Sequence, residues 1–360
     1  MKLIPLAKPQ ISREERTAVN RVLRTLNLAQ GPEVKNFENE FSKFVEDREC
    51  VAVNSGTSAL HLCLIALGIG PGDEVIVPSF TFAATANVVS LVGATPIFVD
   101  IDPKTYCLDP LMIKDAITTK TRAIIVVHLY GLPADMKSIC RIADENSLLV
   151  IEDAAQAHIA SIDGKLVGTF GDAAAFSFYP TKNMTSGEGG MAVLKESSIA
   201  RVCRLLRNQG MEKRYQNEIV GFNLRMTDIH AAIGRVQLRK LPKMTERRIE
   251  NANYLSANLA IDTVPFVGIG YRHVFHQYTV RLKNSREEFS GKLIENGIGN
   301  DVYYPTQVHM LPSFNAGTEL PETLAATQQV LSLPVHPGLS RRDLNKIVSR
   351  FNKIIEEQGS

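Results

Sequence analysis

The sequence at residues 148–158 reads Leu-Leu-Val-Ile-Glu-Asp-Ala-Ala-Gln-Ala-His, an apolar run that ends in two carboxylates and then polar residues. Such a run is typical of a buried strand in an α/β sheet, where ligands lie beyond the carboxyl ends of the strands. Similar short runs, separated by helical stretches, occur at 74–79, 95–101, 123–130, 173–179 and 191–194. This alternation predicts an α/β fold with a mostly parallel sheet that carries helices on both faces.

The composition is that of a large globular protein. The chain has 360 residues, of which 44% are hydrophobic and 22% are charged, so it can bury a sizeable core and extended disorder is excluded. The 40 Lys and Arg residues nearly balance the 38 Asp and Glu residues and leave a net charge of +2. That balance argues against nucleic acid or an anionic membrane as a partner, so an anionic ligand must be held by a local site.

The cysteines and the apolar segments indicate a cellular location. The five cysteines are scattered, with no Cys-x-x-Cys pair and no histidine spacing suited to zinc, which predicts reduced thiols and no metal site. The first residues lack the ~7–15 apolar residues of a signal peptide, and no run approaches the ~20 needed to span a bilayer. We therefore expect a cytoplasmic protein with no membrane partner.

Helical patterns flank the predicted sheet on both sides. Ser12 with Glu15 forms a capping-box pattern, which predicts an opening amphipathic helix that Gly31-Pro32 ends. A second helical pattern at 227–241 continues as a charged stretch to Tyr254, which predicts a long connecting helix.

The connecting helix divides the chain into two predicted domains. Residues 1–245 form the large domain, and residues 246–360 form a small C-terminal α+β domain. The small domain is expected to contain a strand at 277–282 and helices at 286–295 and 342–357.

A first candidate site is Asn54-Ser55-Gly56-Thr57-Ser58, directly before an apolar helical stretch. Hydroxyl residues and a glycine at a helix N-terminus offer hydrogen-bond donors where the helix dipole favours negative charge, which is how phosphate is commonly held. The simpler interpretation is a Ser or Thr N-cap. The segment alone leaves both interpretations open.

A second candidate is Asp153, which stands where the apolar run ends and where a carboxylate can meet a ligand. The alternative is that Asp153 caps the next helix. Glu152 should point to the opposite face of the sheet and is the weaker candidate.

A third candidate is Lys182, which follows the run at 173–179 and precedes a glycine-rich segment. Burial among hydrophobic residues would lower its pKa and make the amine a usable nucleophile, although most lysines are solvated surface charges. A phosphate cradle, Asp153 and a lysine 29 residues later are together the groups that pyridoxal phosphate requires. The lysine makes a Schiff base and the aspartate keeps the ring nitrogen protonated, so that the ring draws electrons.

Over nearly its whole length the chain resembles the sugar-aminotransferase branch of the pyridoxal-phosphate enzymes, the DegT/DnrJ/EryC1/StrS family. The motifs that carry this resemblance occur in the family's order along the chain. They are Gly31-Pro32-Glu33-Val34, Asn54–Leu60, Gly72-Asp73-Glu74-Val75, Glu152–His158, Phe176–Lys182 and Gly221–Met226.

The resemblance implies the aspartate-aminotransferase fold, known as fold type I. It implies that Lys182 forms the Schiff base and shuttles a proton between substrate and cofactor, and that Asp153 pairs with the pyridinium nitrogen. Gln156 would hydrogen-bond the ring hydroxyl and Phe82 would stack on the ring, the alternative for Phe82 being core packing.

Further residue roles follow from the same resemblance. Gly56, Thr57 and Ser177 would hold the phosphate. Two groups of substrate or cofactor contacts complete the predicted site.

The first group reaches across a homodimer interface, so that the active sites are shared. Asn223 would contact the phosphate of the neighbouring subunit, and Arg225 would contact substrate there unless it forms a surface ion pair. The second group, Tyr304 and His309, would contribute to the sugar site.

The leading functional hypothesis is transfer of an amino group from L-glutamate to a nucleotide-linked keto sugar in amino-sugar and cell-surface polysaccharide biosynthesis. The opening segment Ile4–Pro9 and Val127–Gly131 look like members that act on 4-keto-6-deoxyhexoses, which favours C-4 over C-3. Gln209 departs from the histidine of many relatives and leaves the subclass open.

The same residues disfavour other functions. A sugar dehydratase of this fold has histidine in place of Lys182, and a non-catalytic regulator would be favoured by loss of Lys182 or Asp153. A nicotinamide dehydrogenase needs Gly-x-Gly-x-x-Gly after a strand, whereas the glycines at 68–72 follow a helix and read as a loop. Serine-hydrolase and P-loop motifs do not occur.

Overall fold

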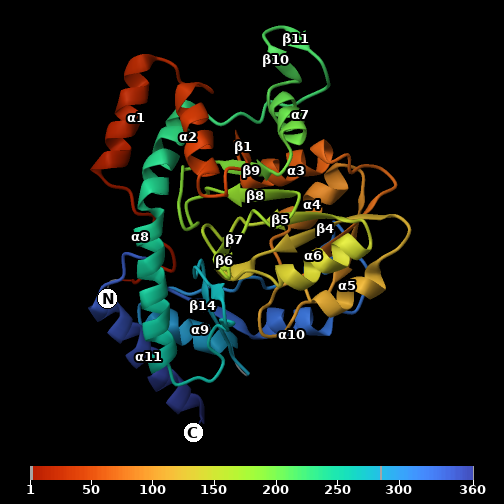
Figure 1. Cartoon of the computed structure of the whole chain (residues 1–360). Helices are drawn as coiled ribbons and strands as arrows, with labels where there is room; N and C mark the ends of the chain where they lie inside the picture. Colours follow the sequence, from red (N-terminus) through yellow and green to blue (C-terminus); the bar gives the residue numbers. More distant parts are fainter. Residues whose placement is uncertain (1–2, 284–285, 360) are drawn as a thin grey trace.

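A seven-stranded sheet forms the centre of the computed structural model, which describes residues 3–283 and 286–359 (Figure 1). The strands lie in the order β1 (Glu49–Val53), β9 (Gly190–Leu194), β8 (Ala173–Ser177), β5 (Leu149–Asp153), β4 (Thr121–Val127), β2 (Glu74–Pro78) and β3 (Thr95–Val99). β9 runs antiparallel to both neighbours, and the other neighbouring pairs are parallel. The prediction of a mostly parallel α/β sheet is therefore confirmed.

Helices cover both faces because alternate strand residues point to opposite sides. One apolar cluster joins Val75, Ile125 and Ile151 to helices α3 (Gly56–Ala66), α4 (Ala84–Leu91) and α7 (Ser197–Arg207). On the other face, two clusters join the intervening strand residues to α2 (Pro32–Ser42), α5 (Pro110–Ala116) and α6 (Met136–Glu145). Strands buried on both sides explain the uninterrupted apolar runs of the sequence.

The opening helix forms as predicted but ends earlier. α1 (Arg13–Thr25) begins with the capping box of Ser12 and Glu15, and it stops where Leu26 takes a left-handed conformation with φ 62°. Gly31-Pro32 instead begins α2, with Gly31 as N-cap. Proline is well tolerated in the first helical turn, where its missing N–H would have no partner, so assigning this dipeptide as a helix end was wrong.

The long helix α8 (Asp228–Asn258) continues through Pro242 for 31 residues and connects the two predicted domains. Beyond it, the helices α9 (Arg286–Glu295) and α11 (Arg341–Gly359) pack around β13 (Tyr278–Arg281) and β14 (Val330–Leu333), whereas α10 (Pro321–Gln329) places Ala326 in an apolar cluster of the large sheet. Ile4 belongs to the apolar cluster of this C-terminal part and bridges to Ile298. The N-terminal segment thus packs on the C-terminal elements of the chain.

The remaining elements are short and connect these parts. They are β6 (Ser161–Ile162), β7 (Lys165–Leu166), β10 (Met211–Lys213), β11 (Gln216–Asn217), β12 (Tyr271–Arg272) and the 3-10 turns η1 (Leu129–Gly131) and η2 (Val308–Met310). Across the described ranges, no helix combines the length and apolar character that crossing a membrane requires. All five cysteines are free thiols, and four of them are buried.

Candidate active site

A cavity of about 480 Å³ lies where the carboxyl ends of β5 and β8 meet the N-terminus of α3. It brings together residues that are up to 249 positions apart in the sequence, from Ser55 to Tyr304. The predicted site residues on its wall are Gly56, Thr57, Phe82, Asp153, Gln156, Ser177, Lys182 and Tyr304. The cavity also has Thr81, Tyr179, Glu188 and His276 on its wall, none of which the sequence analysis singled out.

The start of α3 confirms the N-cap interpretation of the Asn54–Ser58 segment and is compatible with the phosphate interpretation. Ser55 is the N-cap, and its Oγ accepts a hydrogen bond from the Ser58 N–H at 3.1 Å. Gly56 and Thr57 follow at the first helical positions and lie on the cavity wall, where the helix dipole favours an anion. A Cβ on Gly56 would stand 2.7 Å from the Ser177 Cβ, so the close approach of Ser177 requires glycine here.

Asp153 is a buried carboxylate that faces the cavity, with 7% of its surface exposed. Its Oδ2 accepts a hydrogen bond from the Thr85 hydroxyl at 2.9 Å, and its Oδ1 accepts one from the Ala155 N–H at 3.2 Å. No helix begins directly after Asp153, because β5 is followed by turns and then by β6, so the capping alternative is wrong. Burial raises the pKa of Asp153, while Thr85, Ala155 and the positive charge of Lys182 act in the opposite direction.

Lys182 lies half-buried on the wall of the same cavity, just past the end of β8. Burial lowers the pKa of its amine to about 8, and the nearby Asp153 carboxylate opposes this shift. The direction of this shift agrees with the expectation that burial lowers the pKa of Lys182.

This lowered pKa predicts how the amine reacts with an aldehyde at different pH values. An amine with a pKa of about 8 is ~10% neutral at pH 7, some 300-fold more than a solvated lysine. When pyridoxal phosphate is added to cofactor-free protein, we expect the rate of Schiff-base formation to rise about tenfold per pH unit up to pH 7 and to level off above pH 8. Stopped-flow absorption measures this rate, and a plateau reached only near pH 10 would contradict the assignment.

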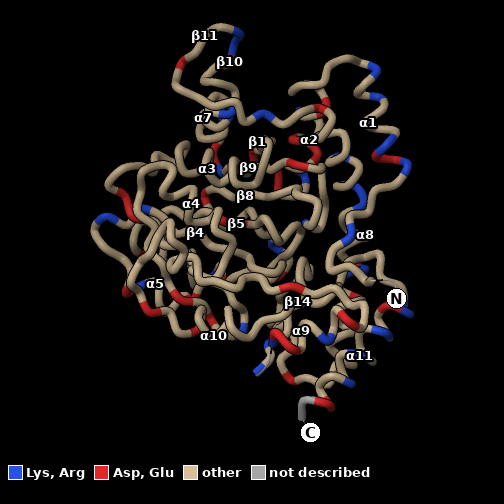
Figure 2. The backbone as a smooth tube through the Cα atoms, turned by 180° about the vertical axis from the view of Figure 1, so that it is seen from behind, with Lys and Arg blue, Asp and Glu red and all other residues tan. Residues whose placement is uncertain are grey.

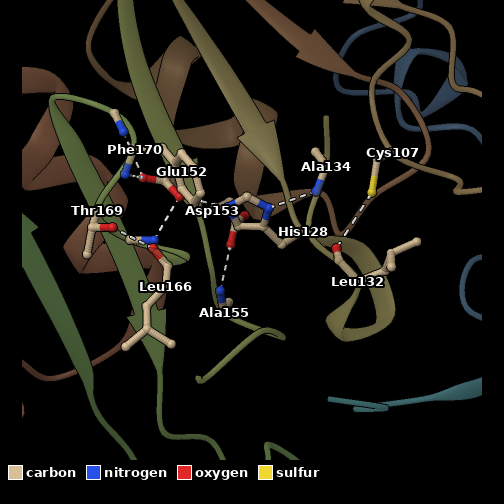
Figure 3. Close-up of polar contacts among 12 residues, drawn as sticks. Cys107, His128, Leu132, Ala134, Glu152, Asp153, Ala155, Leu166, Thr169 and Phe170 are labelled. Carbon is tan, nitrogen blue, oxygen red and sulfur yellow. Dashed lines mark hydrogen bonds and ion pairs between the residues drawn. The ribbon is translucent and has the colours of Figure 1, made fainter. Parts of the chain in front are cut away.

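Glu152 points to the opposite face of the sheet and holds a loop in place (Figure 3). Its oxygens accept hydrogen bonds from the N–H groups of Gly168, Phe170 and Gly171 at 2.7–2.8 Å and from His128 Nε2 at 3.0 Å. His128 Nδ1 in turn accepts from the Ala134 N–H, so Nε2 carries the proton. Despite complete burial, these bonds keep the pKa of Glu152 below its usual value.

Replacing Glu152 by alanine should therefore damage the fold more than the chemistry. The change leaves three N–H groups and one imidazole without their acceptor, which we expect to cost about 3–5 kcal/mol of unfolding free energy. Because the pKa of Glu152 is lowered in the folded state, this contribution is present at neutral pH and is lost as the pH falls below its ordinary value of 4.5. Urea unfolding at pH 7 and pH 4 measures both effects, and equal losses at the two pH values would contradict this account.

Gln156, Tyr304 and Phe82 form one side of the cavity. Gln156 Oε1 accepts from the Tyr130 N–H at 2.7 Å, and its Nε2 donates to the Tyr304 hydroxyl at 3.1 Å. Phe82 is 60% exposed, with its ring centre 6.1 Å from that of Tyr304. The core-packing alternative for Phe82 is wrong, because an exposed aromatic ring on the cavity wall is free to stack on a planar ligand.

Three predicted residues are not on this wall. Asn223 is exposed, and its Oδ1 accepts from Arg225 Nε at 3.0 Å, while Arg225 Nη1 donates to Asn208 Oδ1 at 3.0 Å. Arg225 thus has amide partners rather than the surface ion pair weighed for it. His309 is 1% exposed, and its Nδ1 lies 2.7 Å from the Ser79 hydroxyl, so it is part of the interior and is not brought to the cavity.

The residues on the wall fit pyridoxal phosphate by their chemistry. The start of α3 suits a phosphate, Asp153 suits a protonated ring nitrogen, Phe82 suits a ring face and Lys182 suits an aldehyde. This cavity in a mostly parallel sheet with a small C-terminal part defines a pyridoxal-phosphate-dependent transferase of fold type I.

Comparison with known proteins narrows the class to a family. A model of the DegT/DnrJ/EryC1/StrS aminotransferase family matches residues 9–352. The chain is 39% identical to the Pleiotropic regulatory protein of Geobacillus stearothermophilus, covering 96% of this chain and 94% of that one. It is 40% identical to the GDP-perosamine synthase of Caulobacter vibrioides, covering 98% of both.

A solved structure agrees with these sequence matches. The crystal structure of DesV from S. venezuelae with a ketimine intermediate superposes with a TM-score of 0.95 at 38% identity, covering 99% of both chains. The chain therefore belongs to the DegT/DnrJ/EryC1/StrS aminotransferase family. It is an aminotransferase whose cofactor is pyridoxal 5′-phosphate.

Proposed function

We propose that this aminotransferase moves the amino group of L-glutamate onto the keto carbon of a nucleotide-linked 4-keto-6-deoxyhexose. The observation that carries the proposal is that Lys182, with a pKa lowered to about 8, shares one cavity with the buried Asp153 and the N-terminus of α3. The name of the Caulobacter relative, a GDP-perosamine synthase, supports a sugar nucleotide as the acceptor. The product would enter amino-sugar and cell-surface polysaccharide biosynthesis.

The roles of the side chains follow from their positions. Pyridoxal phosphate supplies an aldehyde that accepts the amino group and a ring that draws electrons from the reacting carbon. Lys182 takes the proton from the substrate carbon and returns it, because its amine is neutral in a large fraction of molecules near pH 8. Asp153 holds the proton on the ring nitrogen, and Thr85 orients the Asp153 carboxylate through its hydroxyl.

The complete site would include a second copy of the chain. Asn223 is exposed, and Arg225 lies beside it at a partly open surface position. Both are therefore available to the cavity of a partner subunit, in a homodimer with shared active sites. With five free thiols and no paired cysteines, a cytoplasmic location fits the same proposal.

The name of the Geobacillus relative favours one second candidate, a regulatory protein that has kept the fold. Retention of both Lys182 and Asp153 in a single cavity speaks for catalysis. A sugar dehydratase is disfavoured because Lys182 is present where such relatives have histidine.

The decisive experiment is a half-reaction followed by absorption. Protein loaded with pyridoxal phosphate is mixed with L-glutamate, and conversion of the cofactor to its pyridoxamine form supports transamination. The aminated protein is then offered 4-keto-6-deoxy sugars and 3-keto sugars on different nucleoside diphosphates, and NMR of the product locates the new amine. A cofactor spectrum that ignores glutamate and other amino donors would contradict the proposal and favour the regulatory candidate.

A further inference from the structure

A second cavity, of about 610 Å³, lies between the N-terminal segment and α11. Figures 1 and 2 show α11 beside α8 from opposite sides, at the end of the molecule away from α7 and the β10–β11 hairpin. Four basic side chains lie on its wall, Lys8, Arg342, Lys346 and Arg350. Its described lining shares no residue with the catalytic cavity.

Three of the four cations form a stripe along α11. Arg342, Lys346 and Arg350 follow one another at intervals of four residues, which places them on one face of the helix over about 12 Å. Like charges at this spacing destabilise a helix unless something neutralises them. A negatively charged partner would therefore stabilise α11.

Most of these cations have no carboxylate partner among the residues that the structure describes. Within the described residues, Lys8, Arg342 and Arg350 have no carboxylate within 4 Å, and Lys346 Nζ reaches only the Gly297 carbonyl oxygen at 3.5 Å. Asp343 is the one acid on the described lining, and its Oδ2 accepts hydrogen bonds from the Ser340 N–H and hydroxyl at the start of α11.

The arginines of another surface hollow behave differently. Arg201, Arg204 and Arg207 line it, and each of them pairs with a glutamate at 2.5–2.9 Å. The cavity at α11 therefore differs from this one in leaving its cations without carboxylate partners among the described residues.

A buried imidazole adds an independent observation. His336 lies on the cavity wall with 2% of its surface exposed, and neither ring nitrogen makes a hydrogen bond of ordinary geometry in the described structure, although the Pro5 backbone interacts with the ring. Buried polar groups nearly always have a hydrogen-bond partner. A ligand atom in the cavity would provide one for the His336 ring. Burial, together with the positive charges of Arg248 and Lys8, lowers the pKa of His336 to about 4 against the opposing effects of the Pro5 backbone and Asp343, so the ring is neutral and carries one N–H.

We propose that this cavity is a binding site for a diphosphate group, distinct from the catalytic cavity, in which Arg342, Lys346, Arg350 and Lys8 contact the phosphate oxygens and His336 donates a hydrogen bond. Guanidinium groups match phosphate oxygens in pairs, and cations spread over two helical turns suit two linked phosphates better than a single one. Because Lys8 belongs to the N-terminal segment and the other cations to α11, the ligand would fasten this segment to the small domain.

The test is calorimetric titration of cofactor-loaded protein with inorganic pyrophosphate, and separately with GDP and dTDP. The variant Arg342→Gln/Lys346→Gln should bind pyrophosphate about 100-fold more weakly, because each of the two charge-assisted contacts raises the affinity about tenfold. Lys353→Gln is the matched control, since Lys353 lies on the same helix outside the cavity and pairs with Glu357 at 3.7 Å. It should bind as the unaltered protein does, and circular dichroism confirms that both variants are folded.

The titrations distinguish a nucleotide ligand from a diphosphate ligand, and they distinguish this cavity from the catalytic cavity. Nucleoside diphosphates that bind more tightly than pyrophosphate, and that lose affinity in the double variant, identify a nucleotide ligand. Equal affinities identify recognition of the diphosphate alone. Lys182→Ala protein should bind pyrophosphate normally, so this proposal and the proposed catalysis fail independently. Absence of saturable binding, binding that the double variant leaves unchanged, or equal weakening by Lys353→Gln would overturn it.

Discussion

Replacing Lys182 by alanine should lower the rate of the glutamate half-reaction by at least ~10³-fold, because proton transfer by a positioned side chain alone contributes about 10²–10⁴-fold. The variant also loses the amine whose pKa is lowered to about 8 and which reacts with the cofactor aldehyde. Because the side chain is only half-buried, the free energy of unfolding should change by no more than about 1 kcal/mol. Single-turnover absorption and urea unfolding measure the two quantities.

Two further variants separate a chemical role from a loss of positive charge. Lys182→Arg keeps the charge but cannot form a Schiff base, so it should be as inactive as the alanine variant. Lys195→Ala removes an exposed lysine whose Nζ lies 4.0 Å from Asp172 Oδ1, and it should turn over at the unaltered rate. Turnover by Lys182→Ala at the rate of the unaltered protein would refute the catalytic assignment.

The sheet could be predicted because its strands are short apolar runs with strong local patterns. The strand ends differ by one to three residues, as with β4, which ends at Val127 where the sequence suggested Tyr130. β1 (Glu49–Val53) was not predicted, although four of its five residues are buried. Its pairing with β9 joins residues about 140 positions apart, and a sequence read locally carries no signal of such a pairing.

Site residues that lie at or just beyond strand ends could be predicted from the sequence. Residues that reach the site through tertiary packing were harder to predict. Asp153 and Lys182 follow strands, and the topology carries both to one cavity. Thr85, the hydrogen-bond donor to Asp153, lies on α4 and is 68 residues away in the sequence, so nothing local marked it. His309 follows Tyr304 closely in the sequence, but the turn η2 carries it inward to Ser79 instead.

Asp153→Asn should separate catalysis from stability. Asparagine has the same shape and can keep the Thr85 contact, but it cannot pair as an anion with a protonated ring nitrogen. Loss of a buried charge pair of this kind costs about 3–5 kcal/mol, which corresponds to a fall in the half-reaction rate of about 10²–10⁴-fold. Thr85→Val is a milder variant, because it removes only the hydroxyl that donates to Asp153 at 2.9 Å. It should lower the half-reaction rate about tenfold or less.

The stability of Asp153→Asn should move in the opposite direction to that of Glu152→Ala. Burial raises the pKa of Asp153 in the folded state, so its ionisation at neutral pH weakens the fold, and a neutral asparagine removes that penalty. Hydrogen bonds lower the pKa of Glu152, so its ionisation strengthens the fold. We therefore expect cofactor-free Asp153→Asn to unfold at an equal or higher urea concentration at pH 7, and Glu152→Ala at a much lower one. A large loss of stability in Asp153→Asn would mean that Asp153 has a structural role like that of Glu152. It would contradict the assignment of a chemical role to Asp153 and a structural role to Glu152.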